Sequence, residues 1–258
     1  MKLFALKTGM VKTGDSLADV ALEAMRKQNL QLEGNDVLAF ASKAVSCAEG
    51  RTAKLSDVEP SEKAREMAKQ YSLQPEFAEL ILREADAIYG GVEKAVLTLK
   101  SGILAPNAGI DNKNAPVGSV VLWPIDPKKT AKNVRGEINQ KTGKNVGVLI
   151  VDSGLVPLRI GTIGLALAVA GFKPIRDTRG EKDLYGKPLV ITRHAVADDL
   201  ASATHLLMGE AKERTPVVLI RDAPVDYNDG AYGGVDMMMP FKECIFMKPF
   251  LERLRDSK

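Results

Sequence analysis

Short apolar runs alternate with helical patterns along most of this chain. Runs typical of β-strands lie at residues 2–7, 36–42, 95–100, 118–124, 145–154 and 215–222, and a buried strand with a turn is expected at 160–172. Helices are expected at residues 14–30, 61–72, 75–85, 126–143 and 193–211. This alternation predicts an α/β or α+β protein with mixed sheets and helices. The uneven spacing does not support a regular βα barrel.

The length fits one large domain or two intimate lobes. The 258 residues are 45% hydrophobic and 27% charged, enough to bury a substantial core, and no clean linker divides residues 1–258. The net charge of +3 comes from 36 basic and 33 acidic residues, and aromatic residues make up only 5%. So slight a basic excess, with so few stacking side chains, argues against nucleic acid as a partner.

The chain opens without the charged segment, apolar run and small-residue cleavage site of a signal peptide. Only Cys47 and Cys244 could form a disulfide. The apolar run at 160–172 contains three glycines, and it is far shorter than the roughly 20 apolar residues that a membrane helix needs. We therefore expect a cytoplasmic protein that does not bind a membrane.

Several common catalytic and binding motifs are missing. His194 and His205 fall within one expected helix, where they are poor partners for a nucleophilic triad and read as ordinary helix residues. No Cys or His pair has zinc spacing. The chain also lacks the glycine-rich P-loop and the Rossmann fingerprint. Any nucleotide would therefore be held by a binding site without these common motifs.

Polar loops offer better candidates. Residues 102–116, GILAPNAGIDNKNAP, hold three Asn, one Asp, two Gly and two Pro without a period, which predicts a loop. Asp152 ends the apolar strand and is followed by Ser153 and Gly154, so it is either a ligand of a hard cation or a turn and helix-cap residue. Residues 176–189 mix both charge signs and could equally be a solvated surface loop.

Five motifs, in this order and spacing, resemble the coenzyme F420-0:L-glutamate ligase family over nearly the whole chain. They are SKAVSCAEGR (42–51), GILAPNAGIDNKN (102–114), VDSG (151–154) with Arg159 behind it, DTRGEKDLYGKPL (177–189) and ADDLASATHLLMGEAKERTPVVLIR (197–221). The resemblance implies an unusual α/β fold, a homodimer, and GTP-dependent addition of L-glutamate to a deazaflavin coenzyme through γ-linked amides. It also implies a divalent metal, Mg²⁺ or Mn²⁺.

The resemblance also assigns residues to roles. The metal positions are Asp111, Asp152, Ser153 and Glu210. The nucleotide positions are Ser42, Lys43, Asn112 or Asn114, Met208, Gly209, Ala211 and Lys212. As catalytic groups, Lys43 and Arg159 are expected to steady phosphate oxygens while an acyl phosphate forms. Asp177, Arg179 and Asp183 are expected to orient the incoming glutamate, and the apolar run at 160–172 to lie at the subunit contact.

Three departures from the family pattern leave alternatives open. Val156 and Cys47 replace cationic residues, and Glu210 stands where glutamine is typical. These changes touch the expected nucleotide or acid-binding surface rather than the core. One alternative is a γ-glutamyl ligase for a folate-type or other carboxylate acceptor. The other is a non-catalytic relative that binds nucleotide or metal.

Overall fold

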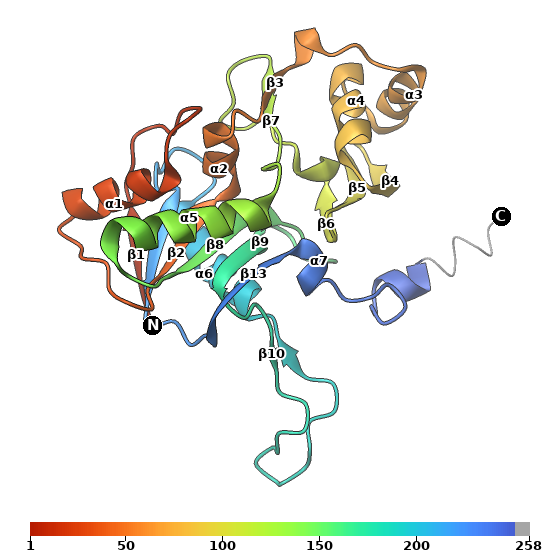
Figure 1. The fold of residues 1–258 in the computed structure, drawn as a ribbon. Coiled ribbons are helices and arrows are strands. Elements are labelled where there is room, and N and C mark those ends of the chain that lie inside the picture. Colours follow the sequence, from red (N-terminus) through yellow and green to blue (C-terminus); the bar gives the residue numbers. More distant parts are fainter. Residues whose placement is uncertain (251–258) are drawn as a thin grey trace.

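The computed structural model describes residues 1–250 and is built around one six-stranded mixed sheet. The strand order is β1 (Lys2–Leu6), β12 (Val217–Arg221), β2 (Val37–Ala41), β8 (Gly147–Gly154), β9 (Ile163–Phe172) and β13 (Tyr227–Gly233). β2 and β8 run parallel, whereas the other neighbouring pairs are antiparallel. The α/β class with mixed sheets is confirmed (Figure 1).

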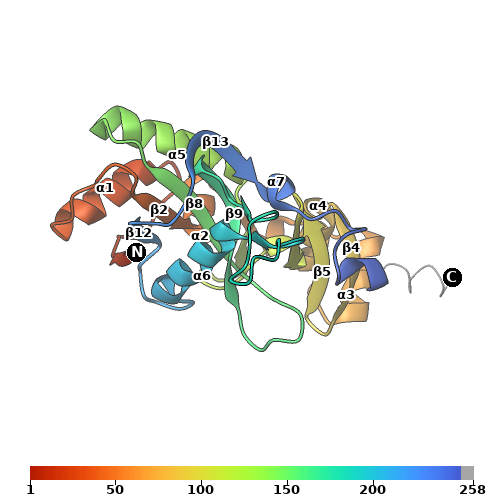
Figure 2. The same ribbon diagram turned by 90° about the horizontal axis from the view of Figure 1, so that it is seen from below.

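Helices cover both faces of this sheet because its central strands are apolar on both sides. In β2, Leu38 and Phe40 pack with α1 (Leu17–Lys27) and α5 (Pro127–Thr142). Val37 and Ala39 point the opposite way and pack with α6 (Val196–Met208). The two helical layers lie on opposite sides of the sheet in Figure 2.

A smaller lobe is inserted between β2 and β8 and has its own core. It contains β3 (Thr52–Lys54), the 3₁₀ turns Leu55–Asp57 and Asn107–Gly109, α3 (Glu62–Tyr71), α4 (Pro75–Glu84), β4 (Ala87–Val92), β5 (Ala95–Lys100), β6 (Ile103–Pro106) and β7 (Ser119–Val121). β3 pairs with β7, and β4, β5 and β6 form a three-stranded sheet. Apolar side chains of α3 and α4 pack with Ala108, Ile110, Val120 and Leu122. The expected two lobes are therefore present (Figure 1).

Local signals explain where the larger helices begin and end. Ser16 caps α1 by accepting the amide N–H of Asp19, and Asp126 caps α5 by accepting the amide N–H of Lys129. α5 ends at Gly143, whose φ of 68° suits a residue without a side chain. The helices and strands expected from the sequence in the large lobe are present, and their observed ends lie within a few residues of the expected ones.

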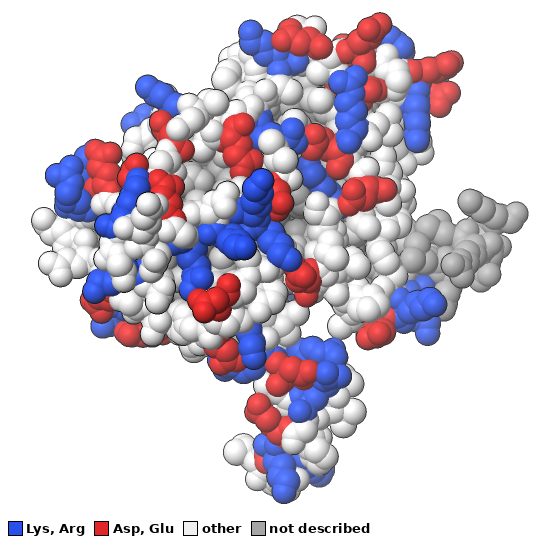
Figure 3. Space-filling view, in the orientation of Figure 1, with Lys and Arg blue, Asp and Glu red and all other residues white. Residues whose placement is uncertain are grey.

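An arm projects from the body between β10 (Arg176–Asp177) and β11 (Arg193–His194), which pair with each other (Figure 1). Its charged residues are of both signs, as Figure 3 shows at the foot of the molecule. After α7 (Gly234–Met237), the described part of the chain continues to residue 250. Within residues 1–250, every helix is too short or too polar to span a lipid bilayer.

One helix was not anticipated from the sequence, and three expectations were wrong in detail. Residues Ser42–Ala48 form helix α2, which is too short to show a period. The expected loop at 102–116 begins later, because Ile103–Pro106 pairs with β5 as strand β6. His194 lies in β11, outside the helix that holds His205. Residues 166–172 are buried between β8 and β13, so this part of the run at 160–172 cannot be a subunit contact.

Candidate functional site

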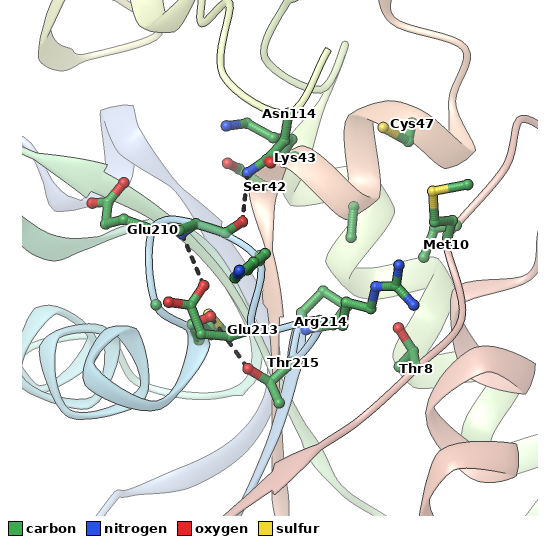
Figure 4. Close-up of a pocket in the computed structure, with 18 of the residues that line it drawn as sticks. Thr8, Met10, Ser42, Lys43, Cys47, Asn114, Glu210, Glu213, Arg214 and Thr215 are labelled. Atoms are coloured by element: carbon green, nitrogen blue, oxygen red, sulfur yellow. Dashed lines mark hydrogen bonds between the residues drawn. The ribbon is translucent and has the colours of Figure 1, made fainter. Parts of the chain in front are cut away.

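A cavity of about 850 Å³ opens on the large lobe, and its volume is within the usual range for small-molecule sites. It lies where the start of α2, the end of β8 and the segment after α6 meet (Figure 4). The predicted residues on its wall are Ser42, Lys43, Asn114, Asp152, Ser153, Met208, Gly209, Glu210, Ala211 and Lys212. The fold therefore brings together residues that are up to 170 positions apart, counted from Ser42 to Lys212.

The parallel pairing of β2 and β8 creates the first contact of the site. Because both strands end at the same edge of the sheet, Ser42 at the start of α2 meets Asp152 near the end of β8. Ser42 Oγ donates a hydrogen bond to Asp152 Oδ1 at 2.7 Å. A strand end and a helix start thus hold a hydroxyl and a carboxylate in one place.

The Asp152 carboxylate has neutral donors on both oxygens. Trp123 Nε1 donates to Oδ2 at 2.5 Å, opposite the Ser42 contact on Oδ1. Burial raises the pKa of Asp152, while hydrogen bonds from Ser42, Trp123 and the Ser153 backbone and the charge of Lys43 oppose that rise. Such a carboxylate gains stability from any positive charge placed beside it.

Asp111 reaches the cavity through Lys43. Asp111 pairs with Val121 by two backbone hydrogen bonds, and this bridge fixes the start of the polar loop. Lys43 Nζ contacts Asp111 Oδ2 at 2.8 Å, and the amide N–H of Lys113 donates to Oδ1 at 2.8 Å. Lys43 lines the cavity and also acts electrostatically on Asp152, so one ammonium serves two carboxylates.

The segment after α6 turns back over the cavity. It turns at Gly209, which has a φ of 70° and lies so close to Glu213 that a Cβ would stand 2.3 Å from Glu213 Cδ. Ala211 donates its amide N–H to Glu213, and Asn114 Nδ2 donates to the Ala211 carbonyl at 3.1 Å. The polar loop and this segment therefore close over one side of the cavity (Figure 4).

Glu210 lies in a polar cluster of its own. Thr162 Oγ1 and His205 Nε2 contact its Oε1 at 2.7 and 2.9 Å, and Lys113 Nζ lies 3.8 Å from Oε2. Burial opposes ionisation of Glu210, but these hydrogen bonds and the charges of Lys113 and His205 lower its pKa overall. Glu210 is therefore an ionised carboxylate on the cavity wall.

The three predicted metal carboxylates do not form one coordination shell here. Within residues 1–250, no three or more His, Cys, Asp or Glu side chains gather closely enough to hold a metal ion. Asp111 is paired with Lys43, and Glu210 with His205 and Thr162. Asp152, Ser153 and Glu210 share the cavity wall, and their binding of one or two cations stays a prediction.

Other predicted residues lie away from this wall. Arg159 is exposed in the segment between β8 and β9, and Asn112 does not line the cavity. On the arm, Arg179 pairs with Asp177, and Asp183 accepts the amide N–H groups of a turn. The expected contact of Asp177, Arg179 and Asp183 with glutamate stays a prediction.

Sequence reasoning missed part of the cavity wall. Residues Thr8 to Thr13, Arg214 and Thr215 line it, although no period or charge pattern marked them. The side chains of Thr8, Met10 and Arg214 lie together in Figure 4. Trp123 was also missed, because its strand was interpreted only as part of the scaffold. Its place as the sole Trp of the chain was the one available signal.

Comparison with known proteins gives consistent matches. The model of a family described as F420-0:gamma-glutamyl ligase matches residues 5–222, a span that includes the whole cavity wall. A coenzyme F420:L-glutamate ligase of Methanopyrus kandleri is 40% identical over 212 residues, covering 82% of this chain and 82% of that protein. Similar proteins of the same name occur in Archaeoglobus fulgidus, 37% identical with coverages of 82% and 83%, and in Methanothermobacter thermautotrophicus, 37% identical with coverages of 83% and 86%.

Proposed function

Because this chain belongs to the F420-0:gamma-glutamyl ligase family, we propose that it joins L-glutamate to coenzyme F420-0 through an amide bond. The observation that carries the proposal is the convergence of Ser42, Lys43, Asp152 and Glu210 on one cavity. A cation, a hydroxyl and two carboxylates suit the handling of phosphate oxygens and a divalent metal.

The proposed reaction uses GTP to activate the acceptor. The γ-phosphoryl group is transferred to a carboxylate oxygen of the acceptor, which gives GDP and an acyl phosphate. The glutamate ammonium loses a proton, and its nitrogen then attacks the acyl carbon. The C–N bond forms, the C–O bond to phosphate breaks, and inorganic phosphate leaves. Amide formation is therefore driven by the cleavage of one phosphoanhydride bond.

The chain's own residues supply positioning and charge. Lys43 lines the cavity, contacts Asp111 behind the wall, and carries the positive charge for a phosphate oxygen. Asn114 holds the segment after α6 against the polar loop on one side of the cavity. We assign the phosphate contact to Lys43 rather than to Arg159, because Arg159 lies outside the cavity wall.

The donor chemistry of the site fits Mg²⁺ or Mn²⁺. The available groups are carboxylate and hydroxyl oxygens, which hard divalent cations prefer. Mg²⁺ is commonly held by one or two carboxylates together with substrate phosphates, so a preformed cluster of three protein ligands is unnecessary. Asp152 and Ser153, with Asp111 and Glu210 nearby, would hold the ion. A bound divalent cation supplies neutralisation of the phosphate charge.

Mass spectrometry of products tests the proposed function. The chain is incubated with coenzyme F420-0, L-glutamate, GTP and Mn²⁺ or Mg²⁺, and one added glutamyl residue is the expected mass change. A folate-type acceptor and ATP are tried in parallel, and Asp152→Asn is the matched inactive control. Glutamate transfer to the folate-type acceptor alone would show that coenzyme F420-0 is not the acceptor. GTP binding without any glutamate-dependent phosphate release would refute a ligase.

A further inference from the structure

Trp123 contacts a polar group of the proposed site directly. It is only 4% exposed, and its indole Nε1 donates to Asp152 Oδ2 at 2.5 Å. Ser42 holds the other oxygen of the same carboxylate at 2.7 Å. The plane of the Asp152 carboxylate is therefore fixed by two donors from separate segments of the chain, Trp123 following β7 and Ser42 following β2.

Both donors are neutral, and this matters for the charge of the carboxylate. An indole N–H is a donor only and does not ionise as an acid or base in the working pH range. Trp123 can therefore orient the carboxylate without cancelling its negative charge. Asp111 differs, because its partner is the ammonium of Lys43. Of these two carboxylates, only Asp152 has neutral side-chain donors on both oxygens, although the charge of Lys43 also acts on it.

The indole itself is held rigidly. A Cβ added to Gly109 would stand 2.1 Å from Trp123 Cε2, so the ring packs directly on the backbone of the polar loop. Arg51 Nε donates to the Trp123 carbonyl at 3.0 Å, and Lys100 Nζ lies 5.8 Å from the ring centroid. The Trp123 side chain is thus restrained at its backbone, at its ring face and at its N–H. A side chain held in this way can fix the orientation of the group that it contacts.

We propose that Trp123 is a positioning residue, whose indole N–H orients the Asp152 carboxylate for the divalent cation that accompanies the nucleotide. This inference rests on the proposed function in one respect, because it takes metal-bound nucleotide as the ligand. It goes beyond that function by assigning a role to a residue that touches neither nucleotide nor acceptor.

Calorimetric titration with GTP and Mn²⁺ tests the proposal without requiring turnover. Trp123→Phe keeps an aromatic side chain, smaller than indole, but removes the N–H, and a hydrogen bond to a charged group is lost. We expect the Kd for GTP in the presence of Mn²⁺ to rise about tenfold. The midpoint of thermal unfolding should fall as well, because phenyl is smaller than indole and loses part of the packing on Gly109; the change in Kd and the cycle below, not the stability, therefore test positioning.

A double-mutant cycle separates positioning from simple structural support. If Trp123 acts through Asp152, the Trp123→Phe change should have little further effect on Kd in an Asp152→Asn background. Lys100→Met is the matched control, because it removes the cation over the ring and a contact with Glu84 but leaves the indole N–H. It should lower thermal stability while leaving Kd unchanged.

The sole Trp of the chain also gives a direct signal. Mn²⁺ is paramagnetic and quenches nearby indole fluorescence, whereas Mg²⁺ does not, so GTP with Mn²⁺ should quench Trp123 and GTP with Mg²⁺ should not. An unchanged Kd in Trp123→Phe, additive effects in the cycle, or no Mn²⁺-specific quenching overturns the proposal. Binding that behaves as expected, together with no glutamate transfer by the unmodified chain, would refute the proposed function alone.

Discussion

Replacing Lys43 by Met should affect metal binding and nucleotide binding in opposite directions. In the ligand-free chain, the Lys43 ammonium lies 2.8 Å from Asp111 Oδ2, beside the carboxylate to which a metal cation would bind. A divalent cation that binds Asp111 must either tolerate this ammonium or displace it. The size of the two energies decides between these possibilities.

Displacement costs far less than coexistence. A divalent and a monovalent cation about 4 Å apart repel by about 8 kcal/mol at an effective dielectric constant of about 20. Breaking the Lys43–Asp111 pair costs about 1 kcal/mol, the usual size for a partly exposed ion pair. Lys43 should therefore swing away, and the metal loses about 1 kcal/mol of affinity to this step. Lys43→Met should then bind Mn²⁺ alone about fivefold more tightly.

The nucleotide should respond in the opposite way. Without the ammonium that faces the phosphate oxygens, Lys43→Met should bind GTP more weakly in the presence of saturating Mn²⁺. Calorimetric titrations with Mn²⁺ alone, and then with GTP, measure both effects. Lys12→Met is the matched control, because Lys12 also lines the cavity but its side chain has no described partner among the carboxylates of the site. Unchanged or weaker Mn²⁺ binding by Lys43→Met would refute the displacement argument.

Three further predictions concern metal demand, pH and packing. Glu210→Gln should raise the Mn²⁺ concentration needed for half-maximal phosphate release, since it removes one negative charge from the cavity wall; an unchanged requirement would place Glu210 outside the coordination shell. Hydrogen bonds from the hydroxyl and amide of Ser61 and from Arg83 lower the pKa of Glu79 from 4.5 to about 2. The ionised form of Glu79 therefore stabilises the fold at pH values above 4.5, and this stability is lost as the pH falls towards about 2. Denaturant titrations should show this loss in the natural chain but not in Glu79→Gln. Gly109→Ala should lower the free energy of unfolding by about 2–4 kcal/mol, because it combines a positive φ with a clash against the indole of Trp123. The control Gly136→Ala, at an open helix position, should raise the free energy of unfolding by about 0.5–1 kcal/mol. Equal effects of the two changes would contradict the packing argument.

Much of the large lobe could be predicted because its signals are local. Periodicity and capping residues place α1 and α5, and continuous apolar runs place β2, β8 and β12. The short elements β3, β4 and β6 gave no such signal, because their pairing partners alone make them strands. Helix α2 is seven residues long and was hidden in the same way.

For the site, the sequence determined which polar segments hold functional residues. The motifs around Ser42, Asp152 and Glu210 identified the family and three parts of one cavity wall. The contacts among these parts followed from the tertiary structure alone. The parallel pairing of β2 with β8 brings Ser42 to Asp152, and the return of the chain from the smaller lobe brings Trp123 to the same carboxylate. Likewise, Lys43 meets Asp111 across a separation of 68 residues, and no local pattern encodes such a contact because strand pairing and lobe packing determine it.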